Sequence, residues 1–347
     1  MKKLILFLIL IVCISIVAKA QKDTSAVTQN AGPESTYNKG VANFQKENYE
    51  EAIKDFDMAI SMKPNFDKAL INRGVSKTKI KEYEGAISDF DLAIDLNPKM
   101  GNAFFNRGFA LFLMNNFDKA QLDFEKAIEL QYSDAKLYYY SGVCKFEKQD
   151  YQGAIELFSK AIDLNKNYAY AYNDRGSAKM NLTDLFGAIE DFHKALAIDE
   201  TMAITHNNLG FAKKKLGDFN GAIEYYTKAI QIKPDYYIAY NDRGASYFNL
   251  GKNEEALADF TSTTKIKPDY AFAYNNLGTL YFKMEKYNDA LQSLDKAIEL
   301  DNKYGIAYFN RGNTKEMLRD ASGACADWKK AAENGVANAR PLIVNCK

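Results

Sequence analysis

The sequence contains few of the side chains that most often carry out chemistry in proteins. It has 2 histidines and 4 cysteines among 347 residues, and its formal net charge is zero. Two isolated histidines, His193 and His206, do not form a metal-binding cluster, and the balanced charge gives no sign of a nucleic-acid-binding surface. No nucleophile elbow and no phosphate-binding loop is present. The sequence therefore predicts no enzyme, no cofactor, no metal and no small-molecule substrate.

The hydrophobic run that stands out in this polar sequence lies at the N-terminus. Two lysines precede an apolar stretch that ends at Val17, and Ala18-Lys19-Ala20 has the small residues typical of a signal-peptide cleavage site. We therefore expect residues 1–20 to be a signal peptide cleaved between Ala20 and Gln21, so that the mature protein is exported and is periplasmic or secreted. The apolar stretch is short for a transmembrane helix, which leaves an uncleaved anchor as the alternative.

A period of 34 residues dominates the rest of the sequence. Stepping by this period connects the glycines Gly40, Gly74, Gly108, Gly142, Gly176, Gly210, Gly244, Gly278 and Gly312. Such a fixed period predicts a stack of helical hairpins, because one hairpin cannot bury its apolar face alone. After a flexible polar spacer at 21–32, the nine repeats are 33–66, 67–100, 101–134, 135–168, 169–202, 203–236, 237–270, 271–304 and 305–338. We expect residues 339–347 to form a capping helix.

The repeat 237–270 illustrates the pattern. Its apolar residues recur three and four apart over 238–250 and again over 254–266, which predicts two helices joined by a turn at Gly251. Gly244 leaves room for the two helices to cross closely, and Phe260 fills the space beside it.

The columns of these repeats match the signature of the tetratricopeptide repeat. The glycine column is joined by an alanine column that begins at Ala52 and an aromatic column that begins at Phe56. Departures are few: Thr263 replaces an alanine, and Leu294 replaces an aromatic residue. The chain therefore resembles the tetratricopeptide repeat family and, with its N-terminal signal, a secreted bacterial array protein. The resemblance implies an all-α fold, a right-handed α-solenoid superhelix whose concave face usually binds peptides or proteins.

A charge pattern recurs in six of the nine repeats, where a basic residue before the glycine is followed sixteen residues later by an aspartate. The pairs are Lys39 with Asp55, Arg73 with Asp89, Arg107 with Asp123, Arg175 with Asp191, Arg243 with Asp259, and Arg311 with Asp327. The three repeats that lack the basic residue also lack the aspartate, and such paired substitution indicates contact. We expect a structural ion pair across each of the six hairpins; the alternative is a row of arginines that bind a ligand.

One position before the basic residue, most repeats carry a short polar side chain. These residues are Asn38, Asn72, Asn106, Asn208, Asn276 and Asn310, with Asp174 and Asp242 in two repeats and Tyr140 as the exception. In the family that the repeats resemble, this position opens on the concave groove. The long array of the O-linked N-acetylglucosamine transferase family has a similar asparagine ladder. A side-chain amide donates and accepts at once, so it can pair with a peptide group of any sequence. We expect apolar pockets beside this ladder from Phe109, Phe112, Phe211, Phe248 and Phe282.

Two alternatives to the ladder remain open. Asparagine is also tolerated at an exposed helical position without a function, and some of the phenylalanines are then core residues. The carboxylate clamp known in the same family needs basic residues that face inward, but Asn102 lies between the candidates Lys68 and Lys136.

The cysteines fit an exported protein. In an oxidising compartment two of them can pair, and we expect Cys325 and Cys346 to form a disulfide that holds the capping helix. Cys144 is expected to be a buried free thiol. Cys13 lies in the N-terminal apolar stretch, where lipidation is an alternative to simple cleavage.

The expected function is a protein–protein interaction scaffold of the cell envelope or exterior, which binds peptide or protein segments in its concave groove. The alternative is a structural subunit that braces a larger envelope or secretion complex through its convex face and its ends. In both cases the partners are proteins or peptides, with no nucleic acid, and any membrane association comes through those partners.

Overall fold

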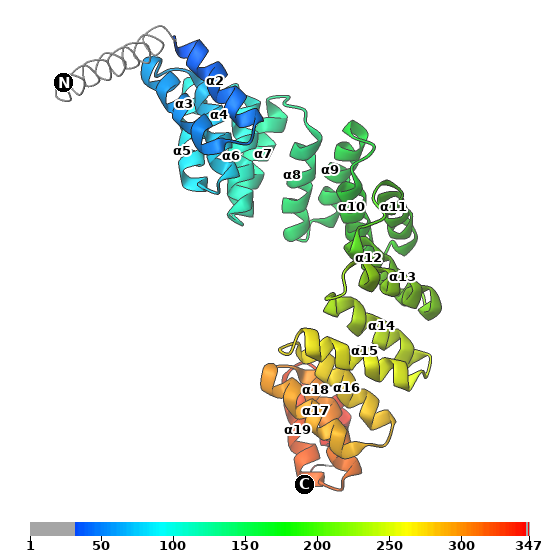
Figure 1. Ribbon diagram of the computed structural model, residues 1–347. Coiled ribbons are helices and arrows are strands. Elements are labelled where there is room, and N and C mark those ends of the chain that lie inside the picture. The colour runs from blue at the N-terminus through cyan, green and yellow to red at the C-terminus, as the bar shows by residue number, and fades with distance from the viewer. Residues whose placement is uncertain (1–31, 345, 347) are drawn as a thin grey trace, which may run out of the picture. The chain divides into compact units, whose positions relative to one another are not determined.

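The computed structural model describes residues 32–344 and 346, and the expected signal peptide and most of the expected spacer lie outside these residues. The chain divides into two compact units, unit 1 from Met1 to Asn165 and unit 2 from Lys166 to Lys347. Every regular element of the described residues is a helix, and the helices of each unit follow one another as hairpins (Figure 1). The prediction of an all-α repeat fold is therefore confirmed.

The helices pair within the expected repeat boundaries in both units. Unit 1 holds α2 (Pro33–Gln45) and α3 (Tyr49–Met62), α4 (Asp67–Lys79) and α5 (Tyr83–Leu96), α6 (Gly101–Leu113) and α7 (Phe117–Glu129), and α8 (Ala135–Glu147) and α9 (Tyr151–Leu164). Unit 2 holds α10 (Ala169–Asn181) and α11 (Leu185–Ile198), α12 (Ala203–Lys215) and α13 (Phe219–Ile232), α14 (Tyr237–Asn249) and α15 (Asn253–Ile266), α16 (Ala271–Lys283) and α17 (Tyr287–Leu300), and α18 (Gly305–Met317) and α19 (Ala321–Glu333).

The two helices of a hairpin cross where a glycine lies against an aromatic ring. A Cβ atom on Gly74 of α4 would lie 2.7 Å from Cε1 of Phe90 in α5. A Cβ atom on Gly244 of α14 would lie 2.8 Å from Cε1 of Phe260 in α15. Atoms cannot approach so closely without displacement, and both phenylalanines are buried in a closely packed core. The glycine column is therefore the space that the aromatic column fills.

The turn inside each hairpin needs one residue in the left-handed backbone region. Gly217 and Gly251 occupy it with φ of 79° and 74°, but Thr183 takes the same place with φ of 66°. The next amide, that of Asp184, donates to the carbonyl oxygen of Lys179 at 2.9 Å and so closes the end of α10. The predicted turn at Gly251 is present, and the same turn forms elsewhere without glycine.

Successive hairpins stack within each unit, because the second helix of one contacts the first helix of the next, as α3 contacts α4 and α13 contacts α14. First helices also contact each other, α2, α4, α6 and α8 in unit 1, and α10, α12, α14, α16 and α18 in unit 2. We call the surface of these first helices the first-helix face of each unit, and the surface of the second helices the second-helix face.

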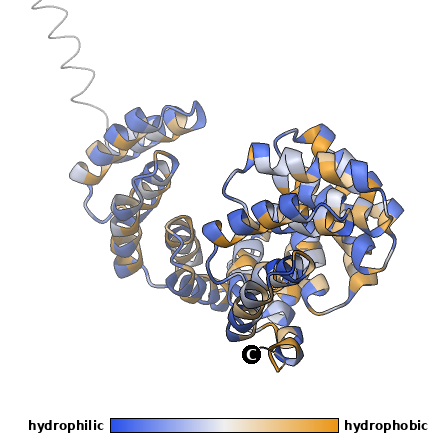
Figure 2. Ribbon diagram, turned by 90° about the horizontal axis from the view of Figure 1, so that it is seen from below, coloured by the Kyte–Doolittle hydropathy of each residue, from blue (hydrophilic) through white to orange (hydrophobic). Residues whose placement is uncertain are grey.

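Hydrophilic and hydrophobic residues alternate along the helices (Figure 2), as expected for amphipathic helices that stack. Within the described part of the chain, none of them is long and apolar enough to cross a membrane.

The C-terminal cap is shorter than the helix predicted at 339–347. The chain forms a 3-10 turn at Ala337–Ala339 and then a single helical turn, α20 (Arg340–Ile343). A disulfide joins Cys346 to Cys325 of α19, so the chain turns back after α20 instead of extending the helix. Residues 345 and 347 lie outside the described part of the chain.

Candidate functional site

A groove crosses the first-helix face of unit 1. It has a volume of about 450 Å³ and runs over α4, α6 and α8. Aromatic and basic side chains dominate its lining, which includes Lys79, Lys81, Phe105, Asn106, Phe109, Lys136 and Tyr140. Two residues predicted for the binding face, Asn106 and Phe109, therefore lie together, and the exception in the predicted ladder, Tyr140, lies with them.

The floor of the groove is a cluster of aromatic rings. The ring centroid of Phe109 lies 6.3 Å from that of Phe105 and 4.8 Å from that of Tyr140. Phe112 adds a ring 5.1 Å from Tyr140. Phe105 is buried, whereas Phe109 and Tyr140 are half-buried and expose ring surface to the groove. Burial raises the pKa of Tyr140, so its hydroxyl stays protonated and able to donate at neutral pH.

Three lysines border the aromatic floor. Lys79, Lys81 and Lys136 are exposed, and within residues 32–344 none of them forms an ion pair. No aspartate or glutamate lines the groove. An apolar floor with a positive border is complementary to a segment that carries apolar and acidic side chains.

The asparagines predicted to form a ladder in unit 1 make contacts within the chain. Nδ2 of Asn72 donates to the hydroxyl of Tyr37 at 2.9 Å, and Nδ2 of Asn106 donates to the backbone carbonyl of Asn102 at 2.8 Å. Asn38 is exposed on α2. Each of these Nδ2 groups uses one N–H in this way, so each amide keeps a second N–H donor and its side-chain oxygen for a ligand.

In unit 2 the predicted ladder residues pair with a second column of asparagines on the preceding first helix. The pairs, with their Nδ2 to Oδ1 distances, are Asn208 with Asn173 at 3.2 Å, Asn276 with Asn241 at 2.8 Å, and Asn310 with Asn275 at 2.9 Å. The accepting side chains are buried, so this asparagine seam links neighbouring first helices. The sequence-based prediction missed the second column, although it recurs with the period of the repeat at Asn173, Asn207, Asn241 and Asn275.

The asparagine seam is interrupted at Asp242. A carboxylate cannot donate a hydrogen bond, and Oδ1 of Asn207, which an asparagine at this place would engage, is buried without a hydrogen-bond partner. Asp242 pairs instead with Lys214, whose Nζ lies 2.6 Å from its Oδ1. Asp174, the other aspartate of the predicted ladder, accepts from Nδ2 of Asn173 at 2.8 Å.

The three phenylalanines predicted to line pockets in unit 2 do not share one pocket. Phe211 borders a groove of about 340 Å³. Nζ of Lys283 lies 4.4 Å from the ring centroid of Phe248 and covers it. Phe282 packs edge-on against Tyr287 across the hairpin turn, with centroids 5.5 Å apart. Phe211, Phe248 and Phe282 therefore do not form a common aromatic floor like the one over α6 and α8.

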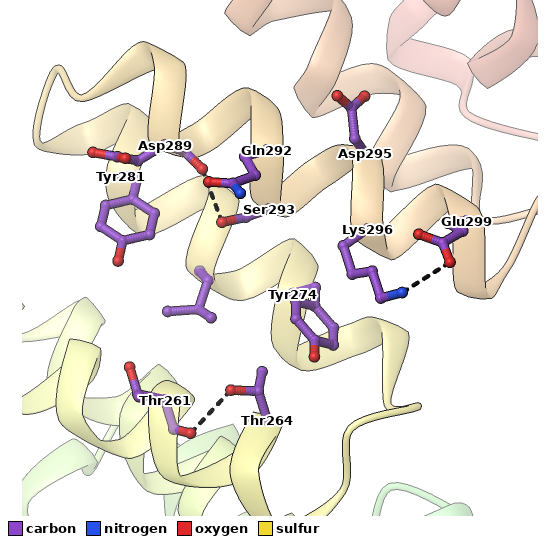
Figure 3. Close-up of a pocket in the computed structure, with 11 residues that line it drawn as sticks. Thr261, Thr264, Tyr274, Tyr281, Asp289, Gln292, Ser293, Asp295, Lys296 and Glu299 are labelled. Atoms are coloured by element: carbon purple, nitrogen blue, oxygen red, sulfur yellow. Dashed lines mark hydrogen bonds and ion pairs between the residues drawn. The ribbon is translucent and has the colours of Figure 1, made fainter.

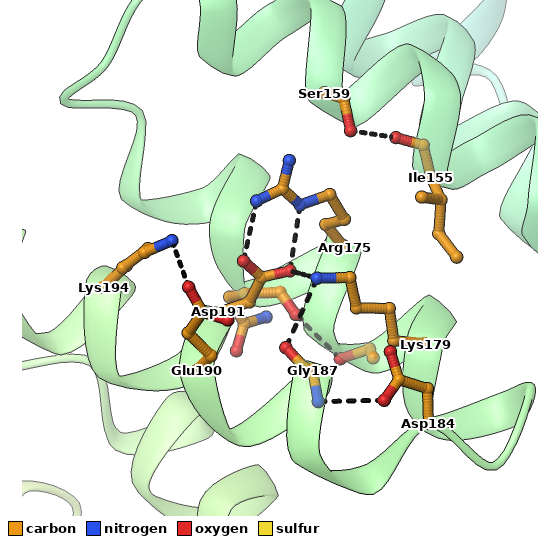
Figure 4. A network of polar contacts seen from close by, with 11 residues as sticks. Ile155, Ser159, Arg175, Lys179, Asp184, Gly187, Glu190, Asp191 and Lys194 are labelled. Atoms are coloured by element: carbon orange, nitrogen blue, oxygen red, sulfur yellow. Dashed lines mark hydrogen bonds and ion pairs between the residues drawn. The ribbon is translucent and has the colours of Figure 1, made fainter.

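Each of the six predicted basic residues contacts its aspartate across the hairpin. Arg73 pairs with Asp89, and the other nitrogen–oxygen distances are 2.7 Å for Lys39–Asp55, 2.7 Å for Arg107–Asp123, 2.7 Å for Arg175–Asp191, 2.8 Å for Arg243–Asp259 and 2.6 Å for Arg311–Asp327. Figure 4 shows Arg175 meeting Asp191 with two nitrogens while Lys179 approaches the same carboxylate. All six carboxylates are buried, so the basic residues have a structural task inside the array.

The remaining arginine nitrogen, Nη1, often reaches the second helix of the preceding hairpin. Its acceptors are Asp57 for Arg73 at 2.6 Å, Asp91 for Arg107 at 2.6 Å, Thr227 for Arg243 at 3.0 Å, and Asp295 for Arg311 at 2.7 Å. One guanidinium thus connects its own hairpin with its neighbour on the second-helix face.

Two other candidate chemical groups, the Cys144 thiol and the His206 imidazole, are buried. Burial raises the pKa of the Cys144 thiol to about 12, so the reactive thiolate is scarce at neutral pH. His206 is buried, with Nε2 3.0 Å from the carbonyl oxygen of Glu200, and burial lowers its pKa. Among the described residues, no three His, Cys, Asp or Glu side chains come together as a metal site.

Family models of one kind match most of the array. The model described as tetratricopeptide repeat matches residues 33–66, 101–131, 203–236 and 271–304, and related repeat models match 67–100, 145–182, 225–258 and 244–285. A comparison with curated proteins found no match.

Solved structures of other proteins resemble the chain in fold. The APC/C hetero-tetramer Cut9–Hcn1 matches with a TM-score of 0.59 and 12% identity, over 90% of this chain and 76% of that one. A tetratricopeptide repeat protein from Parabacteroides merdae matches with a TM-score of 0.56 and 17% identity, over 72% and 98%. PilW, a type IV pilus biogenesis factor, matches with a TM-score of 0.56 and 19% identity, over 60% and 98%. At these identities the likeness concerns the fold alone.

Proposed function

Because the chain belongs to the tetratricopeptide repeat family, whose arrays are protein–protein interaction scaffolds, we propose that its first-helix face holds a segment of a partner protein. The observation that carries the proposal is the groove over α4, α6 and α8, with its aromatic floor and its three unpaired lysines. Apolar side chains of the segment would pack on Phe109 and Tyr140, and its acidic side chains would face the lysines.

Asn106 enters this proposal as a side chain that can both donate to the bound segment and accept from it. Asn106 lines the groove, and one N–H of its Nδ2 already donates to the backbone carbonyl of Asn102. Its side-chain oxygen would accept from a peptide N–H of the bound segment, whatever the sequence of that segment. The second N–H of its Nδ2 can still donate to a peptide carbonyl, so Asn106 keeps the role expected of the ladder, donating and accepting at once.

We also propose that the protein acts in the cell envelope or outside the cell, after cleavage between Ala20 and Gln21. The disulfide between Cys325 and Cys346 supports this location, because disulfides persist in oxidising compartments. N-terminal sequencing of the protein purified from its native cells tests the proposal. A mature chain that begins at Gln21 is the expected result, and a chain that retains Met1 in a cytoplasmic fraction would contradict it.

Cross-linking in the native cell envelope, followed by identification of the captured segments, tests the groove. The test variant is Phe109→Ala with Tyr140→Ala, and the matched control is Phe186→Ala, which removes a phenylalanine that is 77% exposed on α11. Circular dichroism first establishes that both variants fold.

The expected result is that the groove variant loses segments rich in acidic and apolar residues, while the control retains them. A charge-reversal variant, Lys79→Glu with Lys81→Glu, should lose the same segments. Identical capture by all the variants would refute the groove as the binding site.

A further inference from the structure

Three of the nine hairpins lack the arginine–aspartate or lysine–aspartate pair. They carry different residues at the two positions of the pair. Their residues at the two positions are Ser141 and Leu157, Leu209 and Tyr225, and Leu277 and Ser293. The ring of Tyr225 packs against those of His193 and His206, with centroids 6.1 and 6.3 Å away. Leu157 and Tyr225 are large, whereas Ser293 is small, so the repeat 271–304 removes the pair without filling its place.

A pocket of about 680 Å³ lies at that place on the second-helix face of unit 2. It lies between α15 and α17, with side chains of α16 between them. Figure 3 shows Tyr274 and Tyr281 pointing toward Thr261 and Thr264 across the space. The volume is within the range of pockets that bind small ligands.

In the preceding repeat, 237–270, an arginine side chain occupies the position that corresponds to this pocket. Arg243 lies there, with its guanidinium carbon 5.5 Å from the ring centroid of Tyr240 and 5.9 Å from that of Tyr247. Its Nη1 donates to the hydroxyl of Thr227 at 3.0 Å, and its other nitrogens bind Asp259.

The empty pocket keeps three of these four groups. Tyr274, Tyr281 and Thr261 follow Tyr240, Tyr247 and Thr227 by one period of 34 residues, and all three line the pocket. The arginine has become Leu277, and the aspartate has become Ser293. The aromatic and hydroxyl surroundings of a guanidinium are therefore present without a guanidinium.

A carboxylate at the edge of the pocket can replace the missing aspartate. Asp289 lines the pocket and forms no ion pair within residues 32–344. The other charged lining residues are engaged, Asp295 with Arg311 at 2.7 Å and Lys296 with Glu299 at 2.8 Å. The unpaired charge of the pocket is therefore negative and complementary to a cation.

We propose that this pocket binds an arginine side chain presented by a segment of a partner protein. The guanidinium would stack between Tyr274 and Tyr281, donate to the hydroxyl of Thr261, and face the carboxylate of Asp289. Arginine fits better than lysine, because a planar guanidinium stacks on aromatic rings and donates in several directions, whereas an ammonium is a compact, strongly hydrated charge. The site lies in unit 2 and does not depend on the groove of unit 1.

The test uses the full mature chain and a blocked glycine–serine peptide with one central arginine. Binding is followed by chemical-shift changes of backbone amides, with peptides that carry lysine or glutamine in place of arginine as controls. The first variant, Leu277→Arg with Ser293→Asp, recreates the arrangement of the neighbouring repeat, so the chain's own arginine fills the pocket. The second variant, Tyr281→Leu, keeps the pocket empty but removes one stacking ring.

The arginine peptide should shift the amides of Thr261, Tyr281 and Ser293, and both variants should weaken its binding by about tenfold or more. The glutamine peptide should not bind, and the lysine peptide should bind more weakly than the arginine peptide. The proposal is overturned if lysine and arginine peptides bind equally, if the self-filled variant binds as the parent does, or if no shift appears at millimolar peptide. Unchanged circular dichroism of both variants excludes unfolding as the cause of a loss.

Discussion

Nε and Nη2 of Arg243 each donate to one carboxylate oxygen of Asp259, at 2.8 Å in both cases. The Asp259 side chain is only 6% exposed, and burial raises the pKa of its carboxyl group even though the neighbouring guanidinium lowers it. The buried Asp259 and the half-buried Arg243 therefore depend on each other, and a variant that removes one of them leaves the other without its charged partner.

Removing one member of this pair should destabilise the protein more than removing both. We expect Asp259→Leu to lower the free energy of unfolding by about 3 kcal/mol, because the half-buried guanidinium of Arg243 loses its carboxylate partner. The double variant, Arg243→Leu with Asp259→Leu, should lose much less, since the repeat 203–236 already carries Leu209 and Tyr225 at these positions. Hydrogen exchange of α14 and α15 measures both effects locally, because a repeat array need not unfold in two states. A double variant that loses as much as Asp259→Leu and Arg243→Leu lose when added together would contradict the coupling.

The aspartate that begins α13 should stabilise the helix in a pH-dependent way. Oδ1 of Asp218 accepts from the amide of Gly221 at 2.9 Å, and this bond, followed by the contact with Lys213, lowers the pKa of the carboxyl group. Asp218→Ala should cost about 1 kcal/mol at pH 7. A lowered pKa in the folded state means that the charged cap stabilises fully above the unfolded value near 3.9 and less as the pH falls through the folded value. The difference between parent and variant in urea unfolding should therefore shrink in acid.

A matched control for this cap is available on α15. Lys252 occupies the equivalent position and makes no side-chain capping bond. Lys252→Ala should leave the urea midpoint unchanged at both pH values. A loss equal to that of Asp218→Ala would show that the hydrogen bond to Gly221 is not the cause.

The hairpin turn that begins α11 should tolerate glycine better than its native residue. Thr183 holds a left-handed backbone with φ of 66°, a conformation that is costly for a β-branched side chain. Thr183→Gly should raise the free energy of unfolding by about 1 kcal/mol. The reverse change in the next repeat, Gly217→Thr, should lower it by a similar amount. Thermal and urea unfolding measure both, and a loss of stability in Thr183→Gly would contradict the assignment of strain.

Opening the C-terminal disulfide should destabilise the C-terminal cap and leave the stability of the other hairpins nearly unchanged. Reduction, or Cys346→Ser, should destabilise the end of unit 2 by about 3 kcal/mol, because the bond closes a loop between residues separated by 21 positions. Faster hydrogen exchange should be confined to α18, α19 and α20, since each hairpin contacts only its neighbours. Cys144→Ser, which removes a buried thiol elsewhere, should leave that exchange unchanged. Unaltered protection of α19 in Cys346→Ser would show that packing alone holds the cap.

The sequence predicted the hairpins closely because their signals are local and repeated. In the repeat 237–270, helices were expected over 238–250 and 254–266, and α14 and α15 span Tyr237–Asn249 and Asn253–Ile266. Gly244 and Phe260 indicated where the two helices cross, because the missing side chain of the glycine leaves the space that the phenylalanine ring fills. The contact of Arg243 with Asp259 was visible because the two positions change together along the chain.

The contacts of the predicted ladder residues could not be predicted from the sequence, because they form between neighbouring repeats. Asn276 looked like a free amide, but its Nδ2 is engaged by Asn241 on the neighbouring first helix. The groove forms around Tyr140, the one position that broke the predicted ladder. Its ring lies on Phe109 because α6 and α8 pack side by side, which no single repeat reveals.

By itself the sequence determined the repeat, the hairpin boundaries and the charged residues that pair across six of the nine hairpins. Periodicity and paired substitution reveal these features from positions along the chain alone. Only the tertiary structure decided which polar atoms are already engaged and which spaces stay empty, such as the pocket left by Leu277 and Ser293. These outcomes depend on distances between side chains of different repeats, and the stacking of the helices determines those distances.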